Sequence, residues 1–271
     1  MSNVCFIGAG NMARSIIGGL IKQGFEADAI CATATQLRTL ENVAQDFGIR
    51  TLQDNNLAVK DADLIVLAVK PQKMKEVCLA LADAVPAGCV IMSVAAGISC
   101  QSLQQWLGHS SRIVRCMPNT PSLVQKGACG LFASANVSAE QKSLTQKVMQ
   151  AVGEVQWLED ETQMDAVTAV SGSGPAYFFL MLEAMVEAGI EQGLSAEVAQ
   201  RLAIQTAAGA AELARTSDVD LAELRRRVTS PGGTTEQAIQ TFEHLQLRSI
   251  VKQAMQACSD RARQMAIDLG Q

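Results

Sequence analysis

The sequence predicts an α/β chain in two parts, with a doubly wound sheet over residues 1–161 and helices alone over residues 162–271. Three observations support this prediction. A glycine turn joins the first apolar run to a helix, strand-like and helix-like patterns then alternate, and the strand signal disappears from Met164 onward. The length of 271 residues fits two domains, because domains of about 150 residues are typical.

The opening strand, residues 4–7, ends in the pattern G-x-G-x-x-A and leads into a helix that ends near Gly24. Gly8 allows a tight turn, and Gly10 lets the backbone approach a pyrophosphate, while Ala13 fills the small position where helix meets strand. The helix N-terminus would face the phosphates with unpaired N–H groups. This order predicts a Rossmann-like dinucleotide site; a tight turn that binds nothing is the alternative.

The composition is that of a globular protein without a nucleic-acid partner. The net charge of −5 and the pI near 5.2 argue against such a partner, because neutralising phosphates requires clustered Lys and Arg. The only basic run, residues 225–227, is typical of a solvated helix face. The eight cysteines form no C-x-x-C pair and most lie in apolar runs, so we expect reduced thiols and no metal site.

No targeting or membrane-spanning segment is expected. The first strand begins almost at the first residue, without a charged and then apolar leader, which indicates a cytoplasmic protein. The most apolar stretch, residues 176–190, carries Glu183 and Glu187 and is shorter than the roughly 20 apolar residues of a spanning helix. We therefore expect a buried helix there and no membrane partner.

The second strand, residues 29–33, ends where a dinucleotide site selects its cofactor. An acidic residue at this point favours NAD, whereas small hydroxyl residues with a nearby Arg accommodate the 2′-phosphate of NADP. Thr33 and Thr35 stand here, with Arg38 close behind. We therefore favour NADP. The alternative is that the two threonines cap the helix that starts near Leu37.

Further apolar runs predict the rest of the sheet. The run at residues 63–69 ends at Lys70 and Pro71, and the carboxyl ends of parallel strands line the ligand crevice, so Lys70 is expected beside the cofactor. The next run, residues 90–97, ends in small residues on which a flat ring could stack. The other expected elements are strands at residues 113–117, 130–133 and 155–158 and helices at residues 74–84, 100–107 and 139–151.

The second part is predicted to be helical, at residues 177–192, 196–215, 235–244 and 247–269. The small residues at 207–211 let helices approach closely, which indicates an interface between subunits. Two glycine-rich loops, residues 171–177 and 229–235, each precede a helix, and their N–H groups and hydroxyls make plausible carboxylate sites. Simple connectors with Ser and Thr caps are the alternative.

Together these motifs make the chain resemble the pyrroline-5-carboxylate reductases over its whole length. The motifs that carry the resemblance are residues 7–13, 68–71, 95–97, 117–121, 170–177 and 230–235. The resemblance implies hydride transfer from NAD(P)H, with NADPH preferred and NADH possible, to the ring C=N bond of 1-pyrroline-5-carboxylate. The product would be L-proline, in the last step of proline biosynthesis. The family also implies a homodimer of interlocked helical domains, often assembled into a homodecamer.

The resemblance also assigns residues to each ligand. The implied cofactor-binding residues are Ile7, Gly8, Ala9, Gly10, Asn11, Met12, Thr33, Thr35, Asn55, Ala68, Val69, Lys70, Pro71, Val94, Ala95 and Ala96. The implied substrate-binding residues are Glu161, Val228, Ser230, Gly233, Thr234 and Thr235. Many relatives pair the lysine of the second motif with a Glu, whereas this chain has the shorter Asp218 at that place, so a Lys70–Asp218 pair stays open.

The implied chemistry agrees with the lack of a strong proton donor in the motifs. Neither His109 nor His244 lies in a motif, and an imine nitrogen is basic enough to be largely protonated before hydride arrives. The enzyme then needs mainly to orient the ring and hold its charges. We expect Thr235 to hydrogen-bond the ring nitrogen and the amides of residues 232–234 to hold the carboxylate. Lys70 is the second expected catalytic residue.

Two other functions are kept as alternatives. A β-hydroxyacid or F420-dependent dehydrogenase would share the dinucleotide half, but the loop at residues 230–235 would have no role there. A non-catalytic NADP-binding regulator of reductase ancestry would have no need of Lys70, Ser230 and Thr235. Oxidation of NADPH on addition of pyrroline-5-carboxylate, with 2-hydroxyacids as the control, separates these functions.

Overall fold

The computed structural model describes residues 2–270, and the chain divides into two compact units. The first unit extends to Ser173 and takes in the chain again from Ala257, and the second unit is Gly174–Gln256. The expected boundary after residue 161 marks the loss of strand pattern. Packing divides the chain later, because the first helical turns after residue 161 lie against a strand of the sheet.

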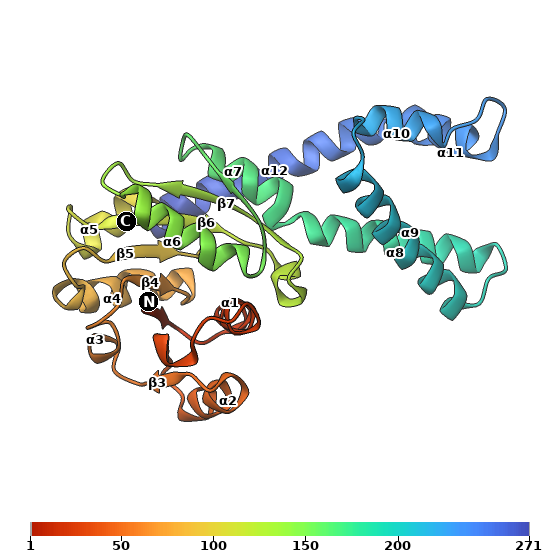
Figure 1. Cartoon of the computed structure of the whole chain (residues 1–271). Coiled ribbons are helices and arrows are strands. Elements are labelled where there is room, and N and C mark those ends of the chain that lie inside the picture. The colour runs from red at the N-terminus through yellow and green to blue at the C-terminus, as the bar shows by residue number, and fades with distance from the viewer. Residues whose placement is uncertain (1, 271) are drawn as a thin grey trace. The chain divides into compact units, whose positions relative to one another are not determined.

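The first unit holds the sheet and the helices that cover it (Figure 1). Its strands are β1 (Val4–Ile7), β2 (Ile30–Thr33), β3 (Arg50–Leu52), β4 (Leu64–Leu67), β5 (Val90–Ser93), β6 (Arg112–Met117), β7 (Gly127–Ala133) and β8 (Gly153–Trp157). Its α-helices are α1 (Asn11–Lys22), α2 (Leu37–Phe47), α3 (Asn55–Ala58), α4 (Pro71–Leu81), α5 (Cys100–Leu107), α6 (Ala139–Gln150) and α7 (Gln163–Val167). Short 3-10 helices are η1 (Ala27–Ala29), η2 (Ala82–Ala84) and η3 (Thr120–Val124). The predicted alternation of strands and helices is confirmed.

The sheet has eight strands in the order β3-β2-β1-β4-β5-β6-β7-β8. The six strands from β3 to β6 are parallel, β7 is antiparallel to β6, and β8 is parallel to β7. Strand order reverses between β1 and β4, and doubly wound sheets bind their ligands at such a switch point. Ile7 pairs with Thr33 on one side and Leu67 on the other, so the ends of β2, β1 and β4 lie level at one edge.

Each face of the sheet carries its own hydrophobic core. Helices α1, α2 and α6 cover one face, where they bury residues such as Phe6 and Ile17. Helices α3, α4 and α5 cover the other face, where they bury Ile7 and Met74. Successive strand residues point to opposite faces, so a strand covered on both sides is apolar at every position. That is why β1, β4 and β5 could be recognised as continuous apolar runs.

Several short elements of the first unit were not predicted, among them β3 and α3. Strand β3 has three residues at the edge of the sheet, and α3 has four residues whose first turn is capped by Asp54. The Asp54 carboxylate accepts the N–H groups of Asn56 and Leu57 at 2.8 and 3.1 Å. Elements this short carry too few residues for a hydrophobic period to be visible.

The second unit is helical, as predicted. Its helices are α8 (Gly174–Glu191), α9 (Ala196–Thr216), α10 (Leu221–Arg227), α11 (Thr234–His244) and the first part of α12 (Leu247–Leu269). Helices α8 and α9 pack against each other where they cross (Figure 1). On α10, Arg226 and Arg227 both pair with Glu223 at 2.6 and 3.0 Å and are exposed, which confirms a solvated face for the basic run.

The expectation that α8 is buried is wrong for the single chain. The side chains of Phe178, Phe179 and Leu180 are 69%, 65% and 67% exposed. The helix is apolar around much of its circumference but has few neighbours in its own chain, so most of its surface is left open. By length and composition alone, the helical run Gln163–Glu191 is also long and apolar enough to cross a membrane, which is weak evidence for one such helix.

The glycine-rich loop expected at residues 171–177 is helical. A π-helical stretch, η4 (Thr168–Gly172), follows α7 and leads through Ser173 into α8. The Ser173 N–H donates to the carbonyl of Thr168 at 2.8 Å, so that donor is used within the helix. The free helix N-terminus expected at this place is therefore not formed there.

The last turns of α12 return to the first unit. Leu269 packs against the core under α4 and α5, and the Ser102 hydroxyl donates to the carbonyl of Gly270 at 3.4 Å. A Cβ atom on Gly97 would lie 3.0 Å from the Cβ of Met265, so α12 touches the loop between β5 and α5. Sequence pattern placed all of α12 in the helical part, because its period does not reveal which neighbours it has.

Candidate cofactor and substrate sites

A cavity of about 270 Å³ lies at the carboxyl edge of the sheet, at the switch point. Eight of the predicted cofactor-binding residues line it. Six come from the glycine turn and the ends of β1 and β2, and the other two are Asn55 and Val69. The full lining is Ile7, Gly8, Ala9, Gly10, Thr33, Ala34, Thr35, Thr39, Gln53, Asn55, Val69 and Val77. The structure therefore brings together residues that are separated by up to 70 positions in the sequence.

The two glycines of the turn have different roles. Gly8 has φ +100°, and a Cβ there would lie 2.7 Å from the carbonyl oxygen of Ala68, so only glycine fits. Gly10 has an ordinary φ of −76°, and a Cβ there would meet nothing within 4 Å. It borders open space, as the close approach of a pyrophosphate requires.

The first turn of α1 is left open for an anion. Its N-cap is Gly10, which supplies no side-chain cap, and the first turn contains no acidic residue. The backbone N–H groups at a helix start lack partners within the helix, and their partial positive charge favours phosphate. The donor set and the space at Gly10 therefore fit a dinucleotide.

Thr33 and Thr35 differ in what their side chains can do. Thr33 is buried, and its hydroxyl donates to the carbonyl of Phe6 at 3.4 Å and accepts the N–H of Gly8 at 3.3 Å. It shapes the glycine turn from the neighbouring strand. Thr35 is exposed at the mouth of the cavity, with Arg38 exposed one helical turn on. The N-cap of α2 is Gln36 without a side-chain cap, so the interpretation of the threonines as helix caps is wrong.

Lys70 stands at the same edge, at the start of α4. It is the exposed N-cap residue, and Pro71 is the first residue of the helix. The strand before it continues the ladder, since the Ala68 N–H donates to the carbonyl of Ile7 at 2.9 Å. Lys70 forms no ion pair with a described residue of its own unit. Its ammonium is thus available at the crevice.

Val94, Ala95 and Ala96 follow β5 at this edge without lining the cavity itself. The Val94 N–H donates to the carbonyl of Leu67 at 3.2 Å, which extends the β4–β5 ladder by one bond. Asn11 and Met12 are the first residues of α1, directly after the glycine turn, and they do not line the cavity either. Val94, Ala95 and Ala96 lie on the far side of β1 from β2, where the second half of a dinucleotide would lie.

Sequence reasoning missed Gln53 and Thr39 of the cavity lining. Gln53 follows the unpredicted strand β3, and its amide donates to the carbonyl of Thr35 at 3.3 Å. Thr39 lies in the first turn of α2. A hydroxyl or amide just after each strand was the available signal, but the strand before Gln53 is too short to recognise.

Glu161 is engaged inside the first unit. Its Oε1 atom accepts the N–H of Cys100 and pairs with the guanidinium of Arg115, both at 2.7 Å. Arg115 is buried with 10% of its side chain exposed, and 27% of the Glu161 side chain is exposed. The role implied by the resemblance, direct substrate contact, stays a prediction, and this oxygen already has two donors.

The turn predicted to hold the substrate belongs to the second unit. Val228 ends α10, and Ser230 and Thr235 are exposed on either side of the turn. Gly232 has φ +71° and donates its N–H to Glu236 Oε2 at 2.8 Å, while the Gly233 N–H donates to the carbonyl of Ser230 at 3.0 Å. Two of the three amides expected to bind a carboxylate are therefore already bonded.

The end of this turn is still suited to an anion. Gly233 is the N-cap of α11 and supplies no side-chain cap, and Thr234 and Thr235 form the first turn. The first backbone N–H groups of a helix lack partners within it, and negative charge is favoured there, as the Glu236 carboxylate in the same turn already shows. A carboxylate contact at Thr234 and Thr235 therefore stays a prediction.

Asn119, in the motif between two prolines, has a structural role. It is buried, its side-chain amide donates to the carbonyl of Ser171 at 2.9 Å, and its Oδ1 accepts the N–H of Ala128 at 2.9 Å. The side chain therefore ties β7 to the π-helical stretch. The motif is therefore more than a turn, because the Asn119 side chain supplies hydrogen-bond partners to the backbone of Ser171 and Ala128.

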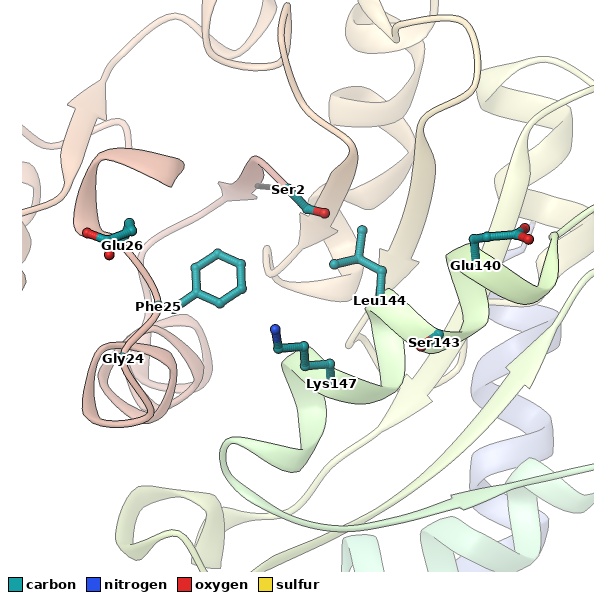
Figure 2. Close-up of a pocket in the computed structure, with 8 residues that line it drawn as sticks. All are labelled: Ser2, Gly24, Phe25, Glu26, Glu140, Ser143, Leu144 and Lys147. Atoms are coloured by element: carbon teal, nitrogen blue, oxygen red, sulfur yellow. The ribbon is translucent and has the colours of Figure 1, made fainter.

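A second cavity, of about 470 Å³, lies away from the predicted site, between the end of α1 and helix α6 (Figure 2). Its lining is Ser2, Gly24, Phe25, Glu26, Glu140, Ser143, Leu144 and Lys147. The ammonium of Lys147 lies 5.8 Å from the ring centre of Phe25. None of the predicted site residues lines it.

Comparison with known proteins matches both parts of the chain. The family model for pyrroline-5-carboxylate reductase dimerisation matches residues 161–265, and that for coenzyme F420-dependent NADP oxidoreductase matches residues 3–97. A pyrroline-5-carboxylate reductase from Pseudomonas aeruginosa is 53% identical over 268 residues, which are 99% of this chain and 98% of the relative.

Solved structures agree with this match. A pyrroline-5-carboxylate reductase from Coxiella burnetii has a TM-score of 0.95 and 45% identity, covering 98% of both chains. A pyrroline carboxylate reductase from Plasmodium falciparum with NADP bound has a TM-score of 0.85 and 26% identity, again covering 98% of both chains. With relatives of this identity over nearly its full length, the chain belongs to the pyrroline-5-carboxylate reductase family.

Proposed function

We propose that this chain reduces the C=N bond of 1-pyrroline-5-carboxylate with NADPH to form L-proline, the last step of proline biosynthesis. The observation that carries the proposal is the 53% identity to a pyrroline-5-carboxylate reductase over nearly the full length of both chains. The open crevice at the glycine turn supports it, because the residues there fit a dinucleotide. Bound NADPH supplies the hydride.

The residues of the first unit hold the cofactor. The N–H groups at the start of α1 bind the pyrophosphate, with Gly8 and Gly10 making room for it. Thr35 and Arg38 at the end of β2 receive the 2′-phosphate, because no acidic residue stands there to repel it. Lys70 places a positive charge at the mouth of the crevice between β4 and α4.

The residues of the second unit hold the substrate. The start of α11 binds the carboxylate through Thr234, and the Thr235 hydroxyl oxygen accepts a hydrogen bond from the protonated ring nitrogen. A cyclic imine needs orientation more than it needs a strong acid, since its nitrogen is basic. Whether Lys70 pairs with Asp218 is decided by a charge-swap variant, in which Lys70→Glu and Asp218→Lys are combined.

The active form is a homo-oligomer, with the dimer as its minimal unit. The support for this proposal is the match of residues 161–265 to a dimerisation model together with the open apolar face of α8. We also propose that five dimers assemble into a decamer and that the protein is cytoplasmic. The apolar helix then meets a partner subunit and not lipid.

The proposal is tested by following NADPH oxidation after addition of 1-pyrroline-5-carboxylate. Proline must form in equal amount to the NADPH consumed, and 2-hydroxyacids with NADP must give no reaction. Binding of NADP without any turnover would favour the non-catalytic regulator, and reaction with a 2-hydroxyacid would favour the dehydrogenase.

Cofactor preference is tested with NADPH and NADH in the same assay. We expect NADPH to have the lower KM. Arg38→Ala should raise the KM for NADPH about tenfold, the scale of one hydrogen bond to a charged group, and leave the KM for NADH unchanged. Lys60→Ala, a change of an exposed cation beyond α3, is the matched control.

A further inference from the structure

The loop between β5 and α5, residues 94–99, borders the crevice on the side away from the adenosine subsite. The end of β2 receives the adenosine half, and the start of α1 receives the phosphates, so the ends of β4 and β5 are left for the nicotinamide half. The near end of the loop is fixed to the sheet by the Val94 N–H, which donates to the carbonyl of Leu67 at 3.2 Å. The Ala95 N–H donates to the Ser93 hydroxyl at 3.3 Å.

The far end of the loop is fixed by Glu161. Cys100, the first residue of α5, donates its N–H to Glu161 Oε1 at 2.7 Å. The cap residue Ser99 already uses its hydroxyl to accept the N–H of Ser102 at 3.0 Å. The Glu161 carboxylate therefore accepts the N–H of Cys100, which the Ser99 cap leaves without a partner. Its negative charge is also favourable at the N-terminus of a helix.

Arg115 holds Glu161 in this place. The guanidinium pairs with the same Oε1 atom at 2.7 Å, and only 10% of the Arg115 side chain is exposed. A guanidinium buried to this degree requires an anionic partner. Arg115 lies on β6 opposite Ser93, the last residue of β5, so the pair connects the strand beside β5 with the helix that the loop enters.

We propose that Glu161, held by Arg115, is a positioning residue that fixes the loop at residues 94–99 for the nicotinamide half of NADPH. This inference rests on the proposed function in taking NADPH as the ligand. The middle of the loop is held as well, because Gly97 lies against Met265 of α12. Loss of the carboxylate frees the helix end of the loop while leaving the glycine turn and the adenosine subsite intact.

The test compares two ligands that share the adenosine half. NADPH and 2′-phospho-ADP-ribose, which lacks the nicotinamide, are titrated into the oligomeric wild type and into Glu161→Gln. We expect the variant to bind NADPH about tenfold more weakly, the scale of one charged hydrogen bond, and to bind 2′-phospho-ADP-ribose as the wild type does. Glu159→Gln, an exposed carboxylate in the same chain segment, is the matched control and should bind both ligands normally.

Two further variants keep the proposal testable if one of them folds poorly. Arg115→Met should weaken NADPH binding as Glu161→Gln does, and Arg115→Lys should recover part of the loss because it keeps one donor. The double variant of Glu161→Gln and Arg115→Met should be no weaker than either single variant, since both act through one contact. Amide hydrogen exchange without ligand should be faster around Cys100 in each weakened variant.

Several outcomes would overturn the proposal. They are an NADPH affinity of Glu161→Gln within twofold of the wild type, an equal loss for both ligands, or a raised KM for pyrroline-5-carboxylate alone. The last of these would return Glu161 to direct substrate contact. Binding is measured without turnover, so a wild type that binds NADPH but reduces no imine refutes the proposed function, while the affinities of Glu161→Gln for the two ligands still decide this inference.

Discussion

The two units of the molecule differ in how completely they bury their own apolar side chains. In the first unit, helices cover both faces of the sheet and enclose two cores. In the second unit, Ala199 and Ala203 are the only buried hydrophobic residues among those that the structure describes. The first unit is complete in one chain, whereas the second needs apolar surface from elsewhere to become stable.

This contrast explains where each half of the site is placed. The predicted cofactor crevice is formed at the carboxyl edge of a sheet that is covered by helices on both faces, which can hold a phosphate-binding turn in one geometry. The turn proposed to hold the substrate lies on helices that bury few apolar side chains within their own chain. We therefore expect assembly to affect the proposed substrate half of the site more than the cofactor half.

The largest effect should come from placing charge on the open face of the second unit. Replacing Phe178 and Phe179 with Asp should abolish assembly, because each buried Phe contributes about 1.5–3 kcal/mol and each change occurs in both subunits. Mass measurement in solution and proline formation should show monomers without activity. Leu79→Asp, on α4 of the first unit, is 55% exposed in the single chain and should leave the oligomer intact. An unaltered oligomer in the double variant would refute the contrast between the units.

The next largest effect concerns the glycine turn of the first unit. Gly8→Ala should cost about 2–4 kcal/mol, since it combines a left-handed φ with a clash against the carbonyl of Ala68. It should lower both Tm and NADPH affinity. Gly10→Ala should lower NADPH affinity and leave Tm unchanged, because its Cβ meets only open space. Equal thermal stability of the two variants, measured by calorimetry, would contradict this account of the turn.

A smaller effect is expected at the substrate turn of the second unit. Thr235→Ala should lower kcat about tenfold to a thousandfold, the scale of losing one polar catalytic contact, while NADPH affinity stays normal. Thr235→Ser should recover much of the rate because it restores the hydroxyl. Thr241→Ala, which removes a hydroxyl that bonds only the carbonyl of Gln237 on the same helix, is the control. Wild-type turnover in Thr235→Ala would refute its assignment.

The smallest effect is a difference between the two units in how much folding stability they lose at alkaline pH. Burial raises the pKa of the Cys78 thiol to about 12, and it likewise raises the pKa values of Cys89 and Cys100 to about 12. All three lie in the first unit. A raised folded-state pKa contributes stability that is present below the unfolded pKa near 9 and lost as pH rises toward 12.

We therefore expect the first unit to lose about 1 kcal/mol per buried thiol between pH 8 and pH 10. Urea unfolding of Cys78→Ala over this range should show a loss smaller by about that amount, since the variant lacks one of the buried thiols with a raised pKa. The second unit holds no cysteine and should not share this loss. An unchanged pH dependence in Cys78→Ala would contradict the assigned burial effect.

The sequence by itself determined the order of elements, the glycine turn and the change to helices after the sheet. Local periods and turn residues carry these features, so β1 followed by Gly8 and Gly10 could be recognised without any neighbour in space. It also indicated the family, because short motifs keep their residue types in order along the chain.

Only the tertiary structure decided which side chains are already engaged. The Thr33 hydroxyl is hydrogen-bonded to the backbone of Phe6 and Gly8. Glu161 pairs with Arg115, which is 46 positions away in the sequence. The end of α12 joined the first unit, and α8 kept its apolar face open. These outcomes depend on contacts between residues distant in sequence, whereas a local pattern reports only the period and polarity of one segment.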